Sequence, residues 1–139
     1  MEHKLPSSGY ILGLDVGKKR IGVAAASAIA KLPQPLDVIS ADETALDQII
    51  AVANKESAEL IVVGIPRNLD GQETSQSQSI RDFTTELAAK TDIPIIFADE
   101  SLSSVRAEGL QRNNNFTGAS SDSLAACFIL EEYFVSNSN

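Results

Sequence analysis

The chain has 139 residues, of which 43% are hydrophobic and 22% charged, a balance that favours one folded domain and excludes an intrinsically disordered chain. Its single cysteine, Cys127, excludes an intrachain disulfide, and no apolar run approaches the roughly 18 residues that a membrane-spanning helix needs. The net charge of −8 is unusual for a protein that binds nucleic acid, because such proteins neutralise phosphates with an excess of Lys and Arg.

The first forty residues predict antiparallel strands. Tyr10–Val16 and Ile21–Ala26 are apolar runs separated by the turn Gly17–Arg20, which is the pattern of a hairpin. Two prolines then frame a short third strand over Leu36–Ile39, which we expect at the edge of a sheet because proline has no N–H to donate. Residues 1–9 show no export signal; we expect them to form a flexible tail and the protein to be cytoplasmic.

The rest of the chain alternates helical and extended patterns. We expect, in chain order, a helix capped by Ser40 or Asp42 and ending near Ser57, a strand Leu60–Gly64, a helix ending near Lys90, a strand Ile93–Phe97, a helix Leu102–Arg112, and a helix capped by Ser120 or Ser121 and ending near Phe134. An antiparallel start followed by β-α-β crossovers predicts an α/β fold, with a mixed five-stranded sheet and helices on both faces. We find no linker or repeat, so we expect a single domain over residues 1–139.

Three acidic residues are expected to meet at one edge of this sheet. Asp15 closes the first strand, Glu100 follows the fifth, and Asp122 opens the last helix. Ligands of such sheets gather outside the carboxyl ends of the strands, and carboxylates are the donors that Mg²⁺ or Mn²⁺ prefers. The trio therefore predicts a site that holds metal for phosphodiester hydrolysis. Taken singly, each residue is explained as well by a turn, a solvated strand end or the first turn of a helix.

Basic residues flank these acidic positions in the sequence. Lys18, Lys19 and Arg20 occupy the turn of the first hairpin, and Arg67 and Arg106 lie in later segments near the other acidic motifs. We expect them to contact substrate phosphates and to form a local basic rim on an acidic protein, although any exposed basic residue is also explained as a solvated surface charge.

Four segments resemble, in order, the motifs of one known family. They read GLDVGKKRIGVA at 13–24, VGIPRNLDG at 63–71, DESLSS at 99–104 and DSLAA at 122–126. Together they are similar to the YqgF family of the ribonuclease H-like superfamily, whose members are assigned to nuclease processing of pre-16S rRNA and were formerly assigned to Holliday junction resolution. The resemblance implies a ribonuclease H-like fold, a divalent metal, and Asp15, Glu100 and Asp122 as metal-binding and catalytic residues. It also implies a role in maturing the 5′ end of 16S rRNA.

Two departures from the family pattern concern substrate binding. Ser101 stands where the family usually has arginine, and residues 113–121 contain none of the lysines that usually precede the third carboxylate. Three readings therefore stay open: a metal-dependent endonuclease acting on pre-16S rRNA, a Holliday junction resolvase acting on branched DNA, and a catalytically weak protein that binds RNA or a ribosome-assembly partner. Whether the protein is a monomer or a homodimer also stays open.

A nucleotide-hydrolysing enzyme is disfavoured. Asp15–Gly17 resembles the first phosphate loop of actin-like ATPases, but those proteins enclose a nucleotide between two such lobes, and 139 residues supply one. The chain also lacks a glycine-rich phosphate loop of the Gly-x-x-x-x-Gly-Lys-Ser/Thr type.

Overall fold

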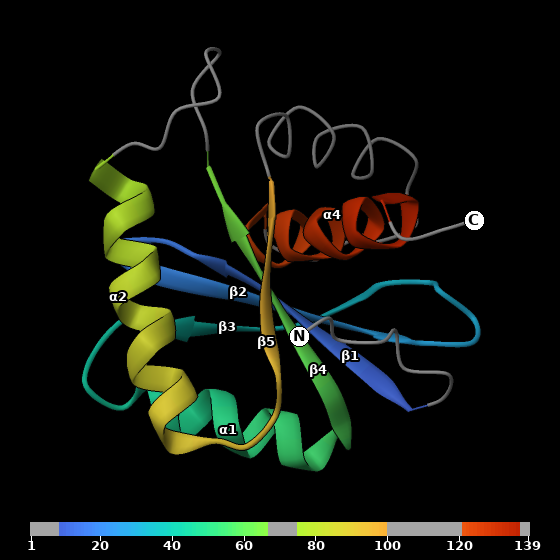
Figure 1. Cartoon of the computed structure of the whole chain (residues 1–139), viewed down its shortest axis with the longest axis horizontal. Helices are drawn as coiled ribbons and strands as arrows, with labels where there is room; N and C mark the ends of the chain where they lie inside the picture. Colours follow the sequence, from blue (N-terminus) through green and yellow to red (C-terminus); the bar gives the residue numbers. More distant parts are fainter. Residues whose placement is uncertain (1–8, 67–74, 100–120, 137–139) are drawn as a thin grey trace.

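The computed structural model describes residues 9–66, 75–99 and 121–136. Its centre is a five-stranded sheet with the strand order β3-β2-β1-β4-β5 (Figure 1). The strands are β1 (Tyr10–Val16), β2 (Arg20–Ser27), β3 (Gln34–Ser40), β4 (Ala58–Ile65) and β5 (Ile95–Asp99). β2 is antiparallel to β1 and β3, whereas β4 is parallel to β1 and β5, so the predicted mixed sheet is confirmed.

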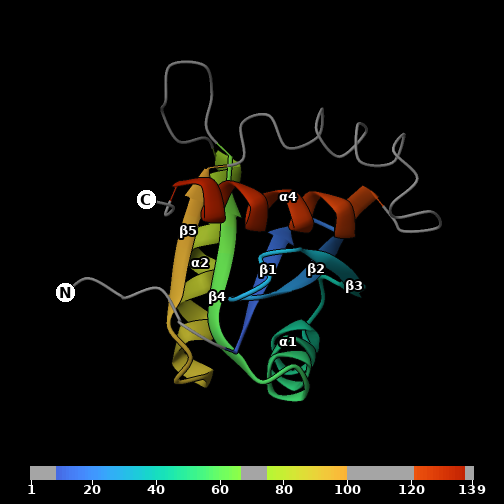
Figure 2. The same ribbon diagram turned by 90° about the vertical axis from the view of Figure 1, so that its right-hand side faces the viewer.

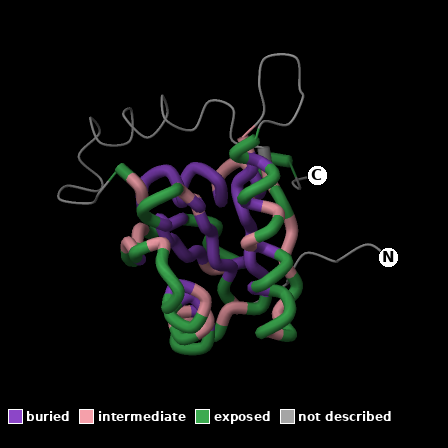
Figure 3. Tube along the Cα trace, turned by 90° about the vertical axis from the view of Figure 1, so that its left-hand side faces the viewer, coloured by how far each residue is buried: buried purple, intermediate pink, exposed green. Residues whose placement is uncertain are grey.

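Three helices in the described part of the chain cover the two faces of the sheet. They are α1 (Ala45–Lys55), α2 (Ser75–Lys90) and α4 (Ser121–Ser136). One core cluster joins the sheet to α1 and α2, and a second joins the opposite face to α4, which crosses the sheet in Figure 2. Figure 3 shows the buried part of the chain running through the sheet and one helix, with exposed stretches on the outer helices. None of the described helices is long and apolar enough to cross a membrane.

The segments between these elements follow local rules of turn formation. The β1–β2 turn is closed by a hydrogen bond of 2.9 Å from the Gly17 N–H to the Arg20 carbonyl, as the hairpin pattern predicts. α1 begins after Thr44, so the expected cap at Ser40 or Asp42 is wrong. The Asp42 carboxylate instead accepts the Thr44 N–H at 2.8 Å and its hydroxyl at 2.6 Å, which shapes the turn before the helix.

The bounds of β2 to β5 differ from the sequence prediction by one or two residues, and those of β3 and β5 have a clear physical reason. β5 begins two residues later than expected, because pairing with β4 starts at Ile95, whereas the carbonyl of Pro94 accepts the N–H of Ile61 at the sheet margin. β3 includes Pro35, which pairs with Ala24, and a proline is tolerated there because β3 is an edge strand. The helix expected at 102–112 and the tail at 1–8 lie outside the described residues.

Candidate active site

Asp15 lies near the end of β1 and on the face of the sheet that α4 covers. Side chains alternate along a strand, and the neighbouring Leu14 and Val16 belong to the core on the α1 and α2 side. Asp15 pairs with Gly22 of β2 in the antiparallel register, and directly paired residues point to the same face. The carboxylate is half-buried, at the end of the strand rather than inside the core.

Asp122 comes close to the strand end that carries Asp15 because Gly22 has no side chain. A Cβ atom built on Gly22 would overlap the backbone carbonyl oxygen of Asp122. The first turn of α4 therefore rests directly on the residue that pairs with Asp15. Further along, a Cβ on Gly13 would lie 2.9 Å from the Ala126 carbonyl and 2.6 Å from the Leu130 Cγ, so the whole helix approaches the sheet closely. A glycine inside a strand often marks such an approach, and this is the signal that the sequence offers.

Arg20 pairs with Asp122 across this junction. The Nε–H of Arg20 donates to Oδ2 of Asp122 at 3.0 Å, and the two side chains are 60% and 30% exposed. Because both are open to solvent, the pair contributes less than about 1 kcal/mol to stability. Arg20 was expected to contact substrate phosphate; in this structure its partner is a carboxylate of the site.

The donor set fits a hard divalent cation. Two carboxylates, Asp15 and Asp122, belong to the same face and the same end of the sheet, and both are partly accessible. Their oxygens are the ligand type that Mg²⁺ and Mn²⁺ prefer. Within the described residues no three acidic, histidine or cysteine side chains form a metal-binding group. Glu100, the third predicted carboxylate, lies outside them and follows β5, which ends at Asp99.

The other predicted substrate-binding residues are divided between the turn and undescribed segments. Lys18 and Lys19 are exposed in the β1–β2 turn, next to the carboxylate end of β1. Lys18 also lines a cavity on the α2 side of the sheet, a feature that the sequence did not predict. Arg67 and Arg106 lie outside the described residues.

The single cysteine has no role in this chemistry. Cys127 is buried in α4, and burial together with the nearby charge of Glu131 raises the pKa of its thiol to about 12. A thiol with so high a pKa is not a nucleophile at neutral pH, which agrees with the sequence interpretation of a structural cysteine.

A family model described as RuvX, Holliday junction resolvase, matches residues 9–136. The chain belongs to the RuvX (YqgF) family. A Chloroflexus aggregans protein named "Putative pre-16S rRNA nuclease" is 37% identical over 135 residues, which cover 93% of this chain and 95% of that protein. An Orientia tsutsugamushi protein of the same name is 37% identical over 126 residues, covering 87% and 80% of the two chains.

The fold of this RuvX-family chain is that of the ribonuclease H-like resolvases. It superposes on the structure of Thermus thermophilus RuvC in complex with a Holliday junction substrate with a TM-score of 0.61, covering 94% of this chain and 97% of the other. The two sequences are 13% identical, so this likeness concerns the fold alone. The predicted family and fold class are thus both confirmed, and the family is one of nucleases.

Proposed function

We propose that this RuvX-family protein is a single-domain, metal-dependent endonuclease that acts in the 5′-end maturation of pre-16S rRNA. The observation that carries the proposal is the contact of the Asp122 backbone with Gly22, the residue paired with Asp15, because it brings two carboxylate-bearing positions to one sheet end. The names of the relatives, which match over most of the chain, favour rRNA as the substrate.

The site residues divide into ligands and phosphate contacts in this proposal. Asp15, Glu100 and Asp122 hold Mg²⁺ or Mn²⁺ through carboxylate oxygens. When bound, a pair of such ions activates the attacking water and stabilises the leaving oxygen. Arg20 pairs with the Asp122 carboxylate and balances its charge before metal and substrate bind.

The basic side chains neutralise phosphates on both sides of the scissile bond. Lys18 and Lys19 extend from the turn that follows Asp15, and Arg67 and Arg106 complete the contacts from the other motifs. An rRNA-processing role places the protein in the cytoplasm.

A branched DNA substrate is the second candidate. It is favoured by the description of the matching family model, which names Holliday junction resolution. A third outcome, binding without cleavage, follows from Ser101 and from the absence of basic residues at 113–121. The three candidates differ in whether the protein cuts nucleic acid and in which nucleic acid it cuts.

A cleavage assay separates them. The substrates are a 5′ precursor fragment of 16S rRNA, a DNA of the same sequence and a four-way DNA junction, each with Mg²⁺, Mn²⁺ or a chelator. We expect metal-dependent cleavage of the RNA that is lost in Asp15→Asn and kept in Asp92→Asn, an exposed carboxylate with the same charge change.

Other results contradict the proposal in distinct ways. Cleavage of the junction alone supports a resolvase, and tight RNA binding without cleavage under either metal supports the binding protein. Cleavage that survives the chelator, or that survives in Asp15→Asn, overturns the metal-dependent mechanism.

A further inference from the structure

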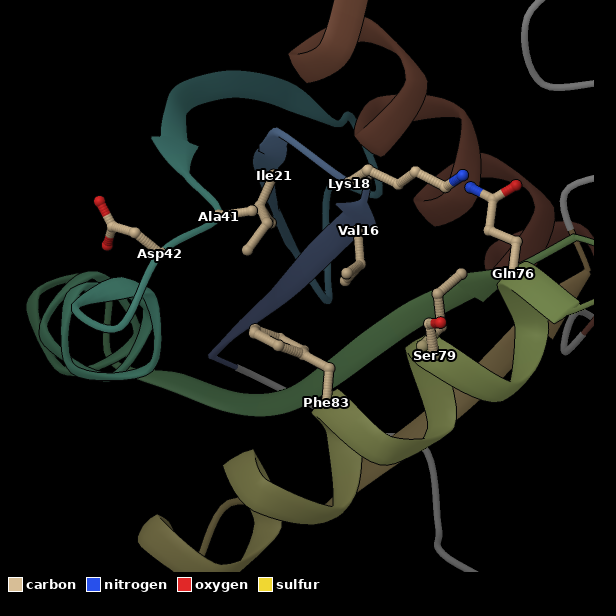
Figure 4. Close-up of a pocket in the computed structure, with 10 residues that line it drawn as sticks. Val16, Lys18, Ile21, Ala41, Asp42, Gln76, Ser79 and Phe83 are labelled. Atoms are coloured by element: carbon tan, nitrogen blue, oxygen red, sulfur yellow. The ribbon is translucent and has the colours of Figure 1, made fainter.

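A cavity of about 310 Å³ opens on the α2 side of the sheet, at the same end of β1 as Asp15. Its volume lies at the lower limit of the range of about 300 to 1,000 Å³ typical of ligand sites, so it has room for one small planar group. The turn after β1, the segment before α1 and the first half of α2 form its walls, as Figure 4 shows. No predicted function used this cavity.

The cavity lining is divided into a polar end and an apolar end. Lys18 and Gln76 extend toward each other at one end, with Ser79 beside them on α2 (Figure 4). Val16 and Phe83 lie on the other side, where the lining is hydrocarbon. An apolar surface with a few convergent polar groups is the usual composition of a site that orients a small ligand.

The cavity adjoins the candidate active site through β1 itself. Val16, which lines the cavity, directly follows Asp15, and the two side chains point to opposite faces of the same strand end. The Cα atoms of the two residues are about 3.8 Å apart, while their side chains lie on the two sides of the sheet. A polymer that holds one phosphate at Asp15 and bends over the end of β1 reaches the mouth of the cavity.

We propose that this cavity accepts one unpaired nucleobase of the RNA, next to the phosphate held at the carboxylates. The proposal rests on the proposed nuclease function and adds a subsite to it. Proteins that recognise single-stranded RNA commonly take up a base that is turned out of the stack, against aromatic or apolar side chains, and hydrogen-bond its edge. Phe83 offers the aromatic contact, and the Gln76 amide supplies a donor and an acceptor for a base edge.

The charges at the rim set the orientation of the nucleotide. The Lys18 ammonium lies at the polar end, where it can contact the phosphate of the same nucleotide. Asp42 lies at the rim beyond the apolar residues, on the opposite side from Lys18, and hydrogen bonds from Thr44 hold the pKa of its carboxyl below the ordinary value, so this rim stays anionic and repels phosphate. The phosphate is therefore at the Lys18 end and the base extends over Val16 and Phe83. A paired base cannot enter, so the subsite selects single-stranded segments.

Nuclear magnetic resonance titration tests the subsite without any need for cleavage. AMP, GMP, CMP and UMP are added singly to the metal-free protein, with ribose 5-phosphate as the base-free control. We expect at least one nucleotide to shift the ring protons of Phe83 and the backbone amide of Ala41. Ribose 5-phosphate, whose phosphate reaches only the Lys18 end, should leave these two positions unmoved. Equal shifts with ribose 5-phosphate, or none at these positions with any nucleotide, overturn the proposal.

Two neighbouring residues of α2 provide a matched pair of variants. Ser79→Phe fills the cavity, whereas Gln78→Phe adds the same ring at an exposed position that does not line it. We expect the nucleotide-induced shifts to vanish in the first variant and persist in the second. If Ser79→Phe does not fold, Gln76→Leu removes the polar contacts while keeping a side chain of similar length, and it must weaken nucleotide binding for the proposal to stand.

An abasic RNA series then tests the subsite in the substrate. Removing the base at one position near the cleaved bond should weaken binding to the wild type about tenfold, the usual effect of losing one stacked base. The same deletion should leave binding to Ser79→Phe unchanged, and equal effects in both proteins contradict the subsite. Nucleotide-induced shifts without RNA cleavage support the nucleobase subsite and contradict the proposed nuclease function. RNA cleavage without nucleotide-induced shifts at the cavity supports the nuclease function and contradicts the subsite.

Discussion

The two faces of the sheet are packed at different distances, and the difference begins with residue size. On the α4 face, β1 and β2 carry small residues at Gly13, Gly22, Ala24 and Ala26, and the larger Ile11 and Asp15 lie toward the two ends of β1. On the α1 and α2 face the same strands carry large branched residues, namely Leu12, Leu14, Val16, Ile21 and Val23. We call these the close face and the wide face.

The comparison shows how one sheet serves two purposes. On the close face the backbone of α4 touches the strands, so the position of Asp122 relative to Asp15 depends on backbone contacts that cannot relax by turning a side chain. On the wide face, side chains hold the helices away from the strands, and the space near the end of β1 remains open as the cavity. The first arrangement suits metal ligands and the second suits a bound group of the substrate.

Adding a side chain at Gly22, on the close face, should have the largest effect on stability. Gly22→Ala places a methyl group against the Asp122 carbonyl, so we expect a loss of about 3 kcal/mol in the free energy of unfolding, at the upper end of overpacking costs. Gly13→Ala meets the movable side chain of Leu130 as well as the Ala126 carbonyl, and should cost less. Urea denaturation measures both.

The same pair separates stability from site geometry. Under conditions where both variants are folded, Gly22→Ala should lose cleavage activity and Gly13→Ala should retain most of it, since only the first displaces Asp122. Equal activities would mean that the contact at Gly22 does not position the site.

Removing the first carboxylate should abolish the response of stability to metal. A 100-fold excess of Mg²⁺ over its dissociation constant stabilises a folded protein by about 2.7 kcal/mol, which corresponds to a rise in Tm of roughly 5 to 10 °C for a domain of this size. We expect this rise in the wild type and in Asp92→Asn, and none in Asp15→Asn. A shift of the same size in all three proteins would place the metal elsewhere.

The turn between β1 and β2 should supply part of the contact with the RNA phosphates. Changing Lys18 and Lys19 to alanine should weaken RNA binding and reduce the slope of log affinity against log salt by about two, because two phosphate contacts are lost. Metal affinity should not change. An unchanged slope in fluorescence anisotropy titrations would show that the phosphates lie away from this turn.

Removing the Arg20 side chain should tighten metal binding, a smaller effect than the loss of binding expected in Asp15→Asn and opposite in sign. Its guanidinium competes with a cation for the Asp122 carboxylate at 3.0 Å, so Arg20→Ala should tighten Mg²⁺ binding by up to about fivefold, the limit set by an exposed pair worth less than about 1 kcal/mol. Isothermal titration calorimetry measures this, and Arg20→Lys is the control that keeps the charge. Weaker Mg²⁺ binding in Arg20→Ala would instead show that Arg20 chiefly orients the carboxylate.

The smallest expected effect concerns Asp42 at the rim of the wide face. The hydroxyl and the N–H of Thr44 donate to its carboxylate and lower its pKa, so the stabilisation is present above the ordinary value of 3.8 and is lost as the pH falls through the lowered pKa. Asp42→Asn should therefore reduce the loss of stability on acidification, as followed by urea denaturation down to about pH 2. Asp92→Asn is the charge-matched control, and identical acid profiles for the two variants would refute the role of Thr44.

Much of the fold was predictable because local patterns and pairing agree. The hairpin of β1 and β2 follows from two apolar runs around Gly17–Arg20, and α2 ends at Lys90 as its pattern of apolar residues predicts. The errors fall at margins. The later start of β5 at Ile95 and the inclusion of Pro35 in β3 depend on which neighbouring strand supplies the hydrogen bonds, and a local pattern does not contain that information.

The candidate site was predictable as a set of residue types but not as an arrangement. Asp15 and Asp122 were identified from their motifs and from their places at a strand end and a helix start. Their relation through Gly22, the pairing of Asp122 with Arg20 and the cavity beside Val16 were not predicted. Each of these depends on contacts between segments separated by many residues in the chain.

The sequence by itself determined the order of the described elements, the fold class and the family, because the alternation of apolar residues, the turn residues and the four motifs are properties of short segments. Only the tertiary structure decided that α4 rests on Gly22 while α2 stands away from Val16. The physical reason is close packing: a helix approaches a sheet as nearly as the facing side chains allow, and which side chains face one another is known only when the sheet and helices are assembled.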